Sequence, residues 1–207
     1  ISNFSGSATF SGFYPNSEYG SINNVIININ STSNFNKEEM NNAGWHVIDS
    51  KNIVEARNDL NKALGKKDKL DNLYLNTHGG REEGSLNNST VTLGEQNFLY
   101  TSELTLAYNG GALNPKTERN IAALESIANR VKEGGNFIFG SCNTGLNERF
   151  GIIISQNNAF REKNVYLNAD ITQFPNGNTP LISANQFFNR QTPEVYYRRG
   201  WTQFLNG

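Results

Sequence analysis

The sequence predicts a single α/β domain whose core is a mostly parallel, open sheet with helices on both faces. Short apolar segments rich in β-branched and aromatic residues alternate with segments of helical periodicity, which is the pattern of parallel strands joined by helices. The chain has 207 residues, enough for one large domain with a substantial core. It shows no internal repeat of the length typical of solenoid proteins.

Residues 1–21 are rich in Ser, Gly, Asn and Tyr and lack a sustained period. We expect an irregular lead-in or linker there, with an edge strand at Ala8–Phe13, followed by one domain over residues 22–207. The first clear strand is a short β-branched run of the kind buried in a parallel sheet. The predicted strands are Val25–Ile29, Trp45–Ile48, Leu70–Thr77, Asn136–Gly140 and Val165–Ala169.

Four segments between these strands have features of helices. In the third of them, apolar residues recur at helical spacing, and Gly134–Gly135 is expected to end the helix. Residues 81–113 predict a hairpin or small antiparallel excursion followed by a loop. Residues 171–207 predict a short helix at Ser183–Asn189 and a closing strand or tail. The four predicted helices are Ser33–Asn42, Ile53–Leu64, Thr117–Lys132 and Asn147–Phe160.

Composition argues against several classes of function. The formal net charge is −1, without the basic excess of a nucleic-acid-binding protein. One cysteine cannot form an internal disulfide, and together with two histidines it makes a poor metal set, so we expect no metal and no cofactor. The mean hydropathy is −0.57, and no apolar run reaches the ~18 residues of a membrane span. We therefore expect no nucleic acid and no membrane among the partners.

The chain begins at Ile1, without a Met and without a basic-then-apolar signal segment. From this we expect a piece of a longer or processed parent protein, such as a bacterial effector or toxin that is secreted or delivered as part of a larger chain.

Reactive side chains follow two of the predicted strands. His78 closes the third strand, and Cys142 closes the fourth. Ligands of open parallel sheets bind outside the carboxyl ends of the strands, and neighbouring strands lie about 4.8 Å apart. If these two strands are neighbours, both side chains emerge at the same edge. A thiolate is a strong nucleophile, and an imidazole can activate it or protonate a leaving amine.

The residues around this pair also suit acyl transfer. Gly79 follows the histidine, and its backbone N–H could point at a developing oxyanion together with the N–H of Cys142. A helix beginning near Asn147 would favour a thiolate at Cys142. The second histidine, His46, lies inside a predicted strand and away from its carboxyl end, so we interpret it as structural.

These segments resemble the caspase-like superfamily of cysteine peptidases (clan CD). The resemblance lies in Leu73–Gly79 (LYLNTHG), a strand followed by His-Gly, and in Phe137–Cys142 (FIFGSC), a strand followed by Ser-Cys. The order of the preceding elements also agrees, including a second strand that follows a glycine at Gly44–Val47. The similarity covers roughly residues 25–170. The superfamily includes caspases, metacaspases, gingipains, clostripain-like enzymes, separase and the autoprocessing domains of bacterial toxins.

The resemblance implies an α/β/α sandwich and peptide-bond hydrolysis by a Cys142–His78 dyad, with Gly79 and Cys142 N–H groups as oxyanion hole. It implies no third acid. The arginines with which caspases select aspartate are absent from Asn30–Ser33 and from Gly140–Cys142. A pocket for Arg or Lys would need a buried acid, and Asp170, just past the fifth strand, is the best placed; its alternative role is a helix cap or turn residue.

We therefore expect a cysteine endopeptidase whose substrate is another protein or peptide, or the remainder of its own parent chain. The alternative is a caspase-like pseudoenzyme that acts as a protein-interaction module. An acyl-transfer enzyme of unrelated fold is less favoured, because the sequence contains no G-x-S-x-G elbow, no P-loop and no G-x-G-x-x-G motif.

Overall fold

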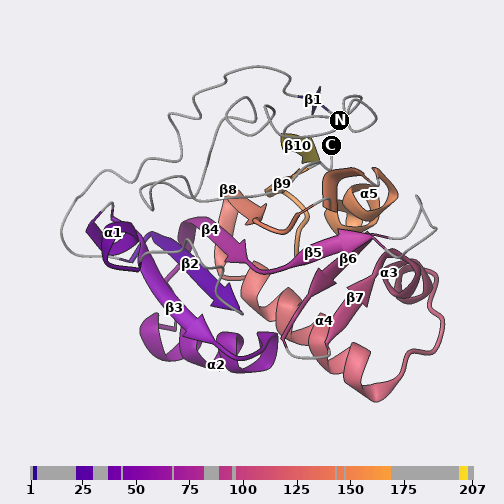
Figure 1. Ribbon diagram of the computed structural model, residues 1–207, viewed down its shortest axis with the longest axis horizontal. Helices are drawn as coiled ribbons and strands as arrows, with labels where there is room; N and C mark the ends of the chain where they lie inside the picture. The colour runs from indigo at the N-terminus through magenta and orange to yellow at the C-terminus, as the bar shows by residue number, and fades with distance from the viewer. Residues whose placement is uncertain are drawn as a thin grey trace.

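Parallel strands and the helices between them organise the molecule around one sheet. A computed structural model describes residues 2–3, 22–29, 37–42, 44–66, 68–81, 89–94, 97–142, 144–146, 148–168 and 201–204. Within these residues the main sheet has seven strands in the order β1-β10-β9-β8-β4-β2-β3 (Figure 1). The predicted α/β class is confirmed.

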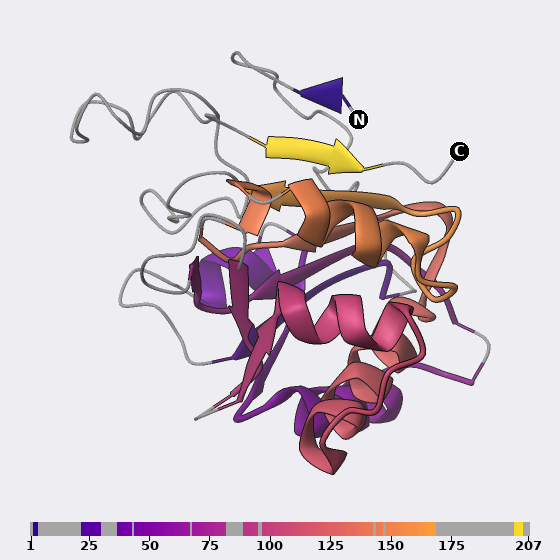
Figure 2. The ribbon, with the colours of Figure 1, turned by 90° about the vertical axis from the view of Figure 1, so that its right-hand side faces the viewer.

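Five central strands of this sheet run parallel, and each of the five coincides with a predicted strand to within two residues at either end, except that β8 begins earlier. Two antiparallel strands extend the sheet beyond β9, as Figure 2 shows. One of them, β10, is a closing strand of the kind predicted, and the other comes from the expected lead-in. The strands are β2 (Asn24–Ile29), β3 (His46–Ser50), β4 (Leu70–Asn76), β8 (Val131–Phe139), β9 (Asn164–Asn168), β10 (Trp201–Phe204) and β1 (Ser2–Asn3).

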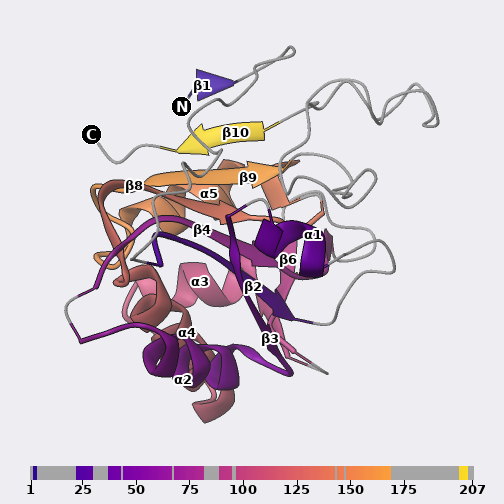
Figure 3. The ribbon, with the colours of Figure 1, turned by 90° about the vertical axis from the view of Figure 1, so that its left-hand side faces the viewer.

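The two faces of the sheet differ in what covers them. On one face, α2 (Ile53–Ala63), α3 (Thr101–Tyr108), α4 (Pro115–Ala128) and α5 (Glu148–Gln156) bury apolar side chains in a single core with alternate strand residues such as Leu73, Leu75, Phe137 and Phe139. On the other face lies α1 (Lys37–Asn42), on the side of β3 opposite α2 (Figures 1 and 3). Met40 of α1 is fully buried outside that core.

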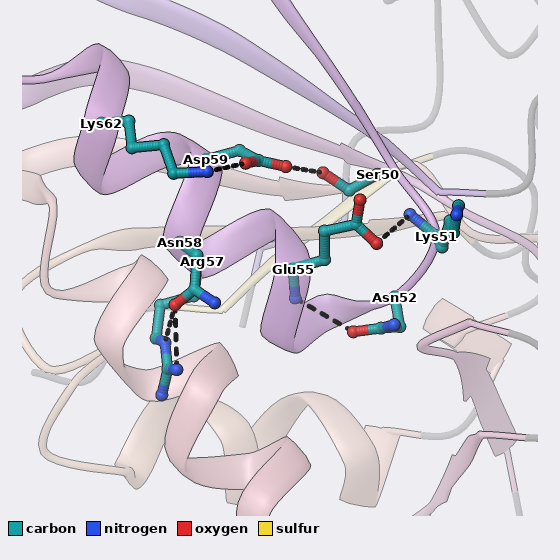
Figure 4. A network of polar contacts seen from close by, with 8 residues as sticks. All are labelled: Ser50, Lys51, Asn52, Glu55, Arg57, Asn58, Asp59 and Lys62. Carbon is teal, nitrogen blue, oxygen red and sulfur yellow. Dashed lines mark hydrogen bonds and ion pairs between the residues drawn. The ribbon is translucent and has the colours of Figure 1, made fainter.

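A helix cap ties α2 to the end of β3. The side-chain oxygen of Asn52 accepts hydrogen bonds from the backbone N–H groups of Val54 (3.1 Å) and Glu55 (3.0 Å), which satisfies donors that the first helical turn leaves unpaired. Figure 4 shows the bond from Glu55. The hydroxyl of Ser50, the last residue of β3, donates to Asp59 of the helix at 3.2 Å. The turn from strand to helix is therefore short and closely held.

A second, three-stranded sheet follows β4 directly. It consists of β5 (Gly79–Arg81), β6 (Ser89–Thr92) and β7 (Phe98–Tyr100), all antiparallel, so the predicted antiparallel excursion is confirmed. The loop predicted after it is wrong in part, because α3 occupies residues 101–108. The Glu103 carboxylate accepts from the Tyr100 N–H at 3.0 Å and from the Thr117 hydroxyl at 2.7 Å, and these bonds hold the start of this short helix.

The boundary between α4 and β8 also differs from the prediction. The helix ends at Ala128, and β8 already begins at Val131, whose backbone pairs with Leu70. One residue of β4 separates Leu70 from the next pair, whereas four residues of β8 do, so β8 carries a bulge here. Gly134 adopts a positive φ of 68° inside this bulge. The glycine pair therefore shapes the strand instead of ending the helix, and apolar Val131 belongs to the strand.

Asparagines join the strands on the α1 face in a continuous ladder. The Asn164 amide donates to Asn136 (3.0 Å), Asn136 donates to Asn72 (2.6 Å), and Asn72 donates to Asn24 (2.7 Å). These four residues are register neighbours near the amino ends of β9, β8, β4 and β2. Each amide satisfies the next, so polar side chains can be buried here at little cost.

We predict that Asn72→Ala lowers the free energy of unfolding by about 2–3 kcal/mol, because Asn24 and Asn136 both lose a buried partner. Urea denaturation measures this loss. Asn164→Ala, at the partly exposed end of the same ladder, is the matched control and should cost less than about 1 kcal/mol. Equal losses in the two variants would show that the ladder does not act through buried amides.

Candidate active site

The structure brings the loops that carry His78 and Cys142 to one edge of the main sheet. Strands β4 and β8 are parallel neighbours, with Leu75 opposite Phe139, and the Gly140 N–H donates to the Leu75 carbonyl at 2.9 Å. His78 follows the end of β4, and Cys142 follows the end of β8. The adjacency on which the predicted pair depended is therefore present.

Gly79 lies directly against the backbone of the cysteine loop. A Cβ atom placed on Gly79 would lie 2.5 Å from the Cys142 carbonyl oxygen, 2.6 Å from Ser141 Cβ and 2.9 Å from the Cys142 nitrogen. Each distance is shorter than a real Cβ contact allows, and two of the atoms belong to the main chain. The His-Gly segment and the Ser-Cys segment thus touch at the one place where a side chain would separate them.

Hydrogen bonds hold both loops in place. The His78 carbonyl accepts from the Thr92 N–H at 2.8 Å, and the Thr77 hydroxyl donates to the Thr92 carbonyl. On the cysteine side, the buried Thr144 hydroxyl donates to the Ser141 carbonyl at 3.1 Å. Residues 77–78 are thereby anchored to β6, and the turn after β8 is anchored to the 3-10 helix η2 (Thr144–Leu146).

The side chains of the site differ in solvent exposure, and the two reactive ones are accessible. His78 is exposed, Cys142 is half-buried, and Ser141 between the two loops is fully buried. A thiol that serves as a nucleophile must be reachable, whereas a structural cysteine is usually buried completely. The His78 side chain, on the adjoining loop, is open to solvent.

Polar side chains form a row along the carboxyl ends of the strands, on the α1 face. The Asn76 amide donates to Asn28 at 2.7 Å, and Asn28 donates to the Asp49 carboxylate at 2.8 Å. Lys37 Nζ contacts the same carboxylate at 2.7 Å. Burial acts to raise the pKa of Asp49, but the bonds from Lys37 and Asn28 outweigh it and leave that pKa below its ordinary value. Asp49 is therefore a carboxylate at neutral pH, two strands away from the β4 end.

Sequence reasoning missed two residues that lie below the cysteine loop. Tyr74 of β4 is fully buried, and a Cβ on Gly140 would collide with its ring and lie 2.6 Å from its hydroxyl oxygen. Burial, and secondly the charge of Cys142, raise the pKa of Tyr74 well above its ordinary value. The available signal was alternation, because Tyr74 lies two residues before Asn76 in β4 and so belongs to the same face of the sheet as the last residue of that strand.

Two other predicted features lie elsewhere. His46 begins β3 opposite Val25, at the amino ends of the strands and therefore at the edge away from His78. Burial, and secondly the charge of Lys37, lower the pKa of His46, although its side chain is exposed. Asp170, and Asn147 at the predicted helix start, lie outside the described residues, as do Ala8–Phe13 and Ser183–Asn189.

The chain matches no protein-family model, and a search of curated proteins finds no relative. In the part of the chain that the structure describes, no helix is long and apolar enough to span a membrane. Nor do three or more His, Cys, Asp or Glu side chains gather there as a possible metal site. The chemistry of this edge must therefore be argued from its own residues.

We predict that Gly79→Ala separates the two loops and lowers the free energy of unfolding by about 1–3 kcal/mol, because its methyl group would collide with the Cys142 backbone. It should also change the rate at which iodoacetamide labels Cys142 in the folded protein.

Gly80→Ala is the matched control, because a Cβ at Gly80 meets only the Thr90 hydroxyl, at an ordinary contact distance of 3.7 Å. Thermal unfolding and the labelling rate should both stay close to those of the unchanged protein. If the two variants unfolded and reacted alike, the close approach at Gly79 would not contribute to the stability of the fold or to the position of Cys142.

Proposed function

We propose that the protein is a cysteine endopeptidase in which Cys142 is the nucleophile and His78 transfers the proton. The single observation that carries this proposal is the close approach of Gly79 to the Cys142 backbone and the Ser141 side chain, because it sets the histidine loop beside the loop of the half-buried Cys142 at a strand-end edge. Hydrolysis by this pair needs no metal and no cofactor.

The first half of the reaction is acyl transfer to sulfur. The Cys142 thiolate attacks the scissile carbonyl carbon, and the carbonyl π electrons move to oxygen to give a tetrahedral oxyanion. When the oxyanion collapses, the C–N bond breaks, and His78 gives its proton to the leaving nitrogen. The products of this half are a free amine and a thioester on Cys142.

The second half restores the enzyme with one water molecule. His78, now neutral, accepts a proton from water as the oxygen attacks the thioester carbon. The C–S bond then breaks, sulfur leaves as the thiolate, and the new carboxyl product departs. One peptide bond and one water are consumed, and the protonated histidine and the thiolate are regenerated.

The oxyanion is assigned to the backbone N–H groups of Gly79 and Cys142. These two residues lie on adjoining stretches of main chain, and the hydrogen bonds from Thr92 and Thr144 hold those stretches in place. Donors that are already oriented stabilise a developing charge without reorganisation in the transition state. The absence of a side chain at Gly79 also lets a substrate backbone approach closely.

The caspase-like superfamily is the proposed relationship. It is supported by the LYLNTHG and FIFGSC segments, which end neighbouring parallel strands, and by the order of elements before them. The substrate is a protein or peptide, supplied by another chain or by a longer protein of which this domain is part. Asp170 remains the proposed acid for a basic side chain at the cleavage site.

We predict that Cys142→Ala and His78→Ala each abolish cleavage, while His46→Ala, at the other edge of the sheet, leaves it within about twofold. The measurement is incubation with a peptide library that is diversified around one scissile position, with products identified by mass spectrometry. Far-ultraviolet circular dichroism checks that each variant folds.

Cleavage that persists in Cys142→Ala would overturn the proposed nucleophile, and cleavage that persists in His78→Ala would require another proton donor. If the unchanged protein cleaves nothing although iodoacetamide labels Cys142, the interaction-module alternative is favoured. Preferred cleavage after Arg or Lys that is lost in Asp170→Asn would support the basic pocket.

A further inference from the structure

The side chain of Tyr74 fills the space left by the missing side chain of Gly140. Tyr74 lies in the middle of β4, between Ile26 of β2 and Ile138 of β8, and is fully buried. Gly140 follows Ile138 on the same face, and a Cβ there would lie 2.6 Å from the Tyr74 hydroxyl oxygen. The phenol therefore extends toward the carboxyl end of β8. Its hydroxyl lies next to Gly140, and Gly140 is two residues before Cys142 in the sequence.

The hydroxyl lies against Gly140, which precedes Cys142 by two residues at the end of β8. Burial is the larger cause that raises the pKa of Tyr74, and the negative charge of Cys142 adds to it. Tyr74 therefore stays protonated throughout the neutral range. A neutral hydroxyl in a buried site can turn its dipole toward an adjacent anion, and such interactions are stronger than in water because the surroundings are less polarisable.

We propose that Tyr74 is a positioning residue for Cys142, whose hydroxyl dipole stabilises the thiolate from within the sheet. This proposal rests on the proposed function, since a stabilised thiolate is useful to a nucleophile. In this proposal Gly140 leaves room for the Tyr74 phenol. Tyr74, in the interior of the sheet, can then act on the Cys142 thiolate at the edge of the sheet.

Other charged groups face this edge, and the test must separate them from Tyr74. His78 lies on the loop that contacts the cysteine backbone, and Asp49, paired with Lys37, ends the polar row two strands beyond β4. Tyr166 of β9 is the register neighbour of Ile138 on the far side of β8 from Tyr74. It is largely buried, so it is a matched control for the loss of a hydroxyl from the same layer.

The experiment compares Tyr74→Phe with Tyr166→Phe by the pH dependence of Cys142 alkylation. Iodoacetamide reacts with the thiolate, so the rate rises with pH through the midpoint of thiol ionisation. We expect Tyr74→Phe to raise this midpoint by about one pH unit, which corresponds to about tenfold slower alkylation below the midpoint. Tyr166→Phe should leave it within about 0.2 units, a margin well below the one-unit effect.

A structural role would not produce this pattern. In Tyr74→Phe, peptide cleavage should fall at neutral pH and recover toward the rate of the unchanged protein above the new midpoint, while thermal unfolding stays cooperative. Should Tyr74→Phe fail to fold, Gly140→Ala provides a second test, because it displaces the phenol but keeps its hydroxyl and should also raise the midpoint.

An unchanged alkylation midpoint in a folded Tyr74→Phe protein overturns the proposal, even if the unchanged protein cleaves peptides. A raised midpoint in a protein that cleaves no peptide supports the action of Tyr74 on the thiolate and removes only the peptidase. Because alkylation needs no substrate, the two proposals can fail separately.

Discussion

The close approach of Gly79 to the Cys142 backbone and the Ser141 side chain is the constraint on which the candidate site depends. It follows from the parallel pairing of β4 with β8, which delivers both loops to the same edge within one strand spacing. Any side chain at Gly79 would force the loops apart. The antiparallel sheet that starts at Gly79 then carries the chain away from the main sheet, and its strand β6 holds the histidine loop through the bond from Thr92 to His78.

Because side chains alternate along the strands, one face of the sheet carries the large apolar core and the other face carries the polar rows. Leu73, Leu75, Phe137 and Phe139 face α2 to α5 and belong to the large core, while the residues between them lie on the opposite face of the sheet. The second face carries an amide ladder near the amino ends, apolar and aromatic side chains in the middle, and a polar row at the carboxyl ends. Asparagine, which occurs 34 times in the 207 residues, therefore has a structural use in two rows of the sheet.

The order and positions of the strands could be predicted from the sequence because buried parallel strands leave short, strongly apolar runs. The same runs located His78 and Cys142 at strand ends, which is a local property. The start of β8 could not be predicted, because Val131 fits the apolar stripe of α4 equally well. Only its pairing with Leu70, on another strand, assigns Val131 to β8. The role of Gly140 was hidden for the same reason, because the Tyr74 ring that fills its space comes from another strand.

The polar row at the carboxyl ends of the strands influences the electrostatic potential at the edge that carries Cys142. Lys37 and Asn28 keep Asp49 ionised, and the positive charge of Lys37 largely cancels the negative charge of Asp49 as felt at the end of β4. Asn76, the end of the row nearest the site, is uncharged and donates its amide to Asn28. Among the described residues, the protonated phenol of Tyr74 lies against Gly140, two residues before Cys142, and His78 lies on the loop that approaches the Cys142 backbone at Gly79. In the proposed mechanism a thiolate at this edge is therefore stabilised by the proton of His78 and by oriented dipoles, which favour the ionised form of a nucleophilic cysteine.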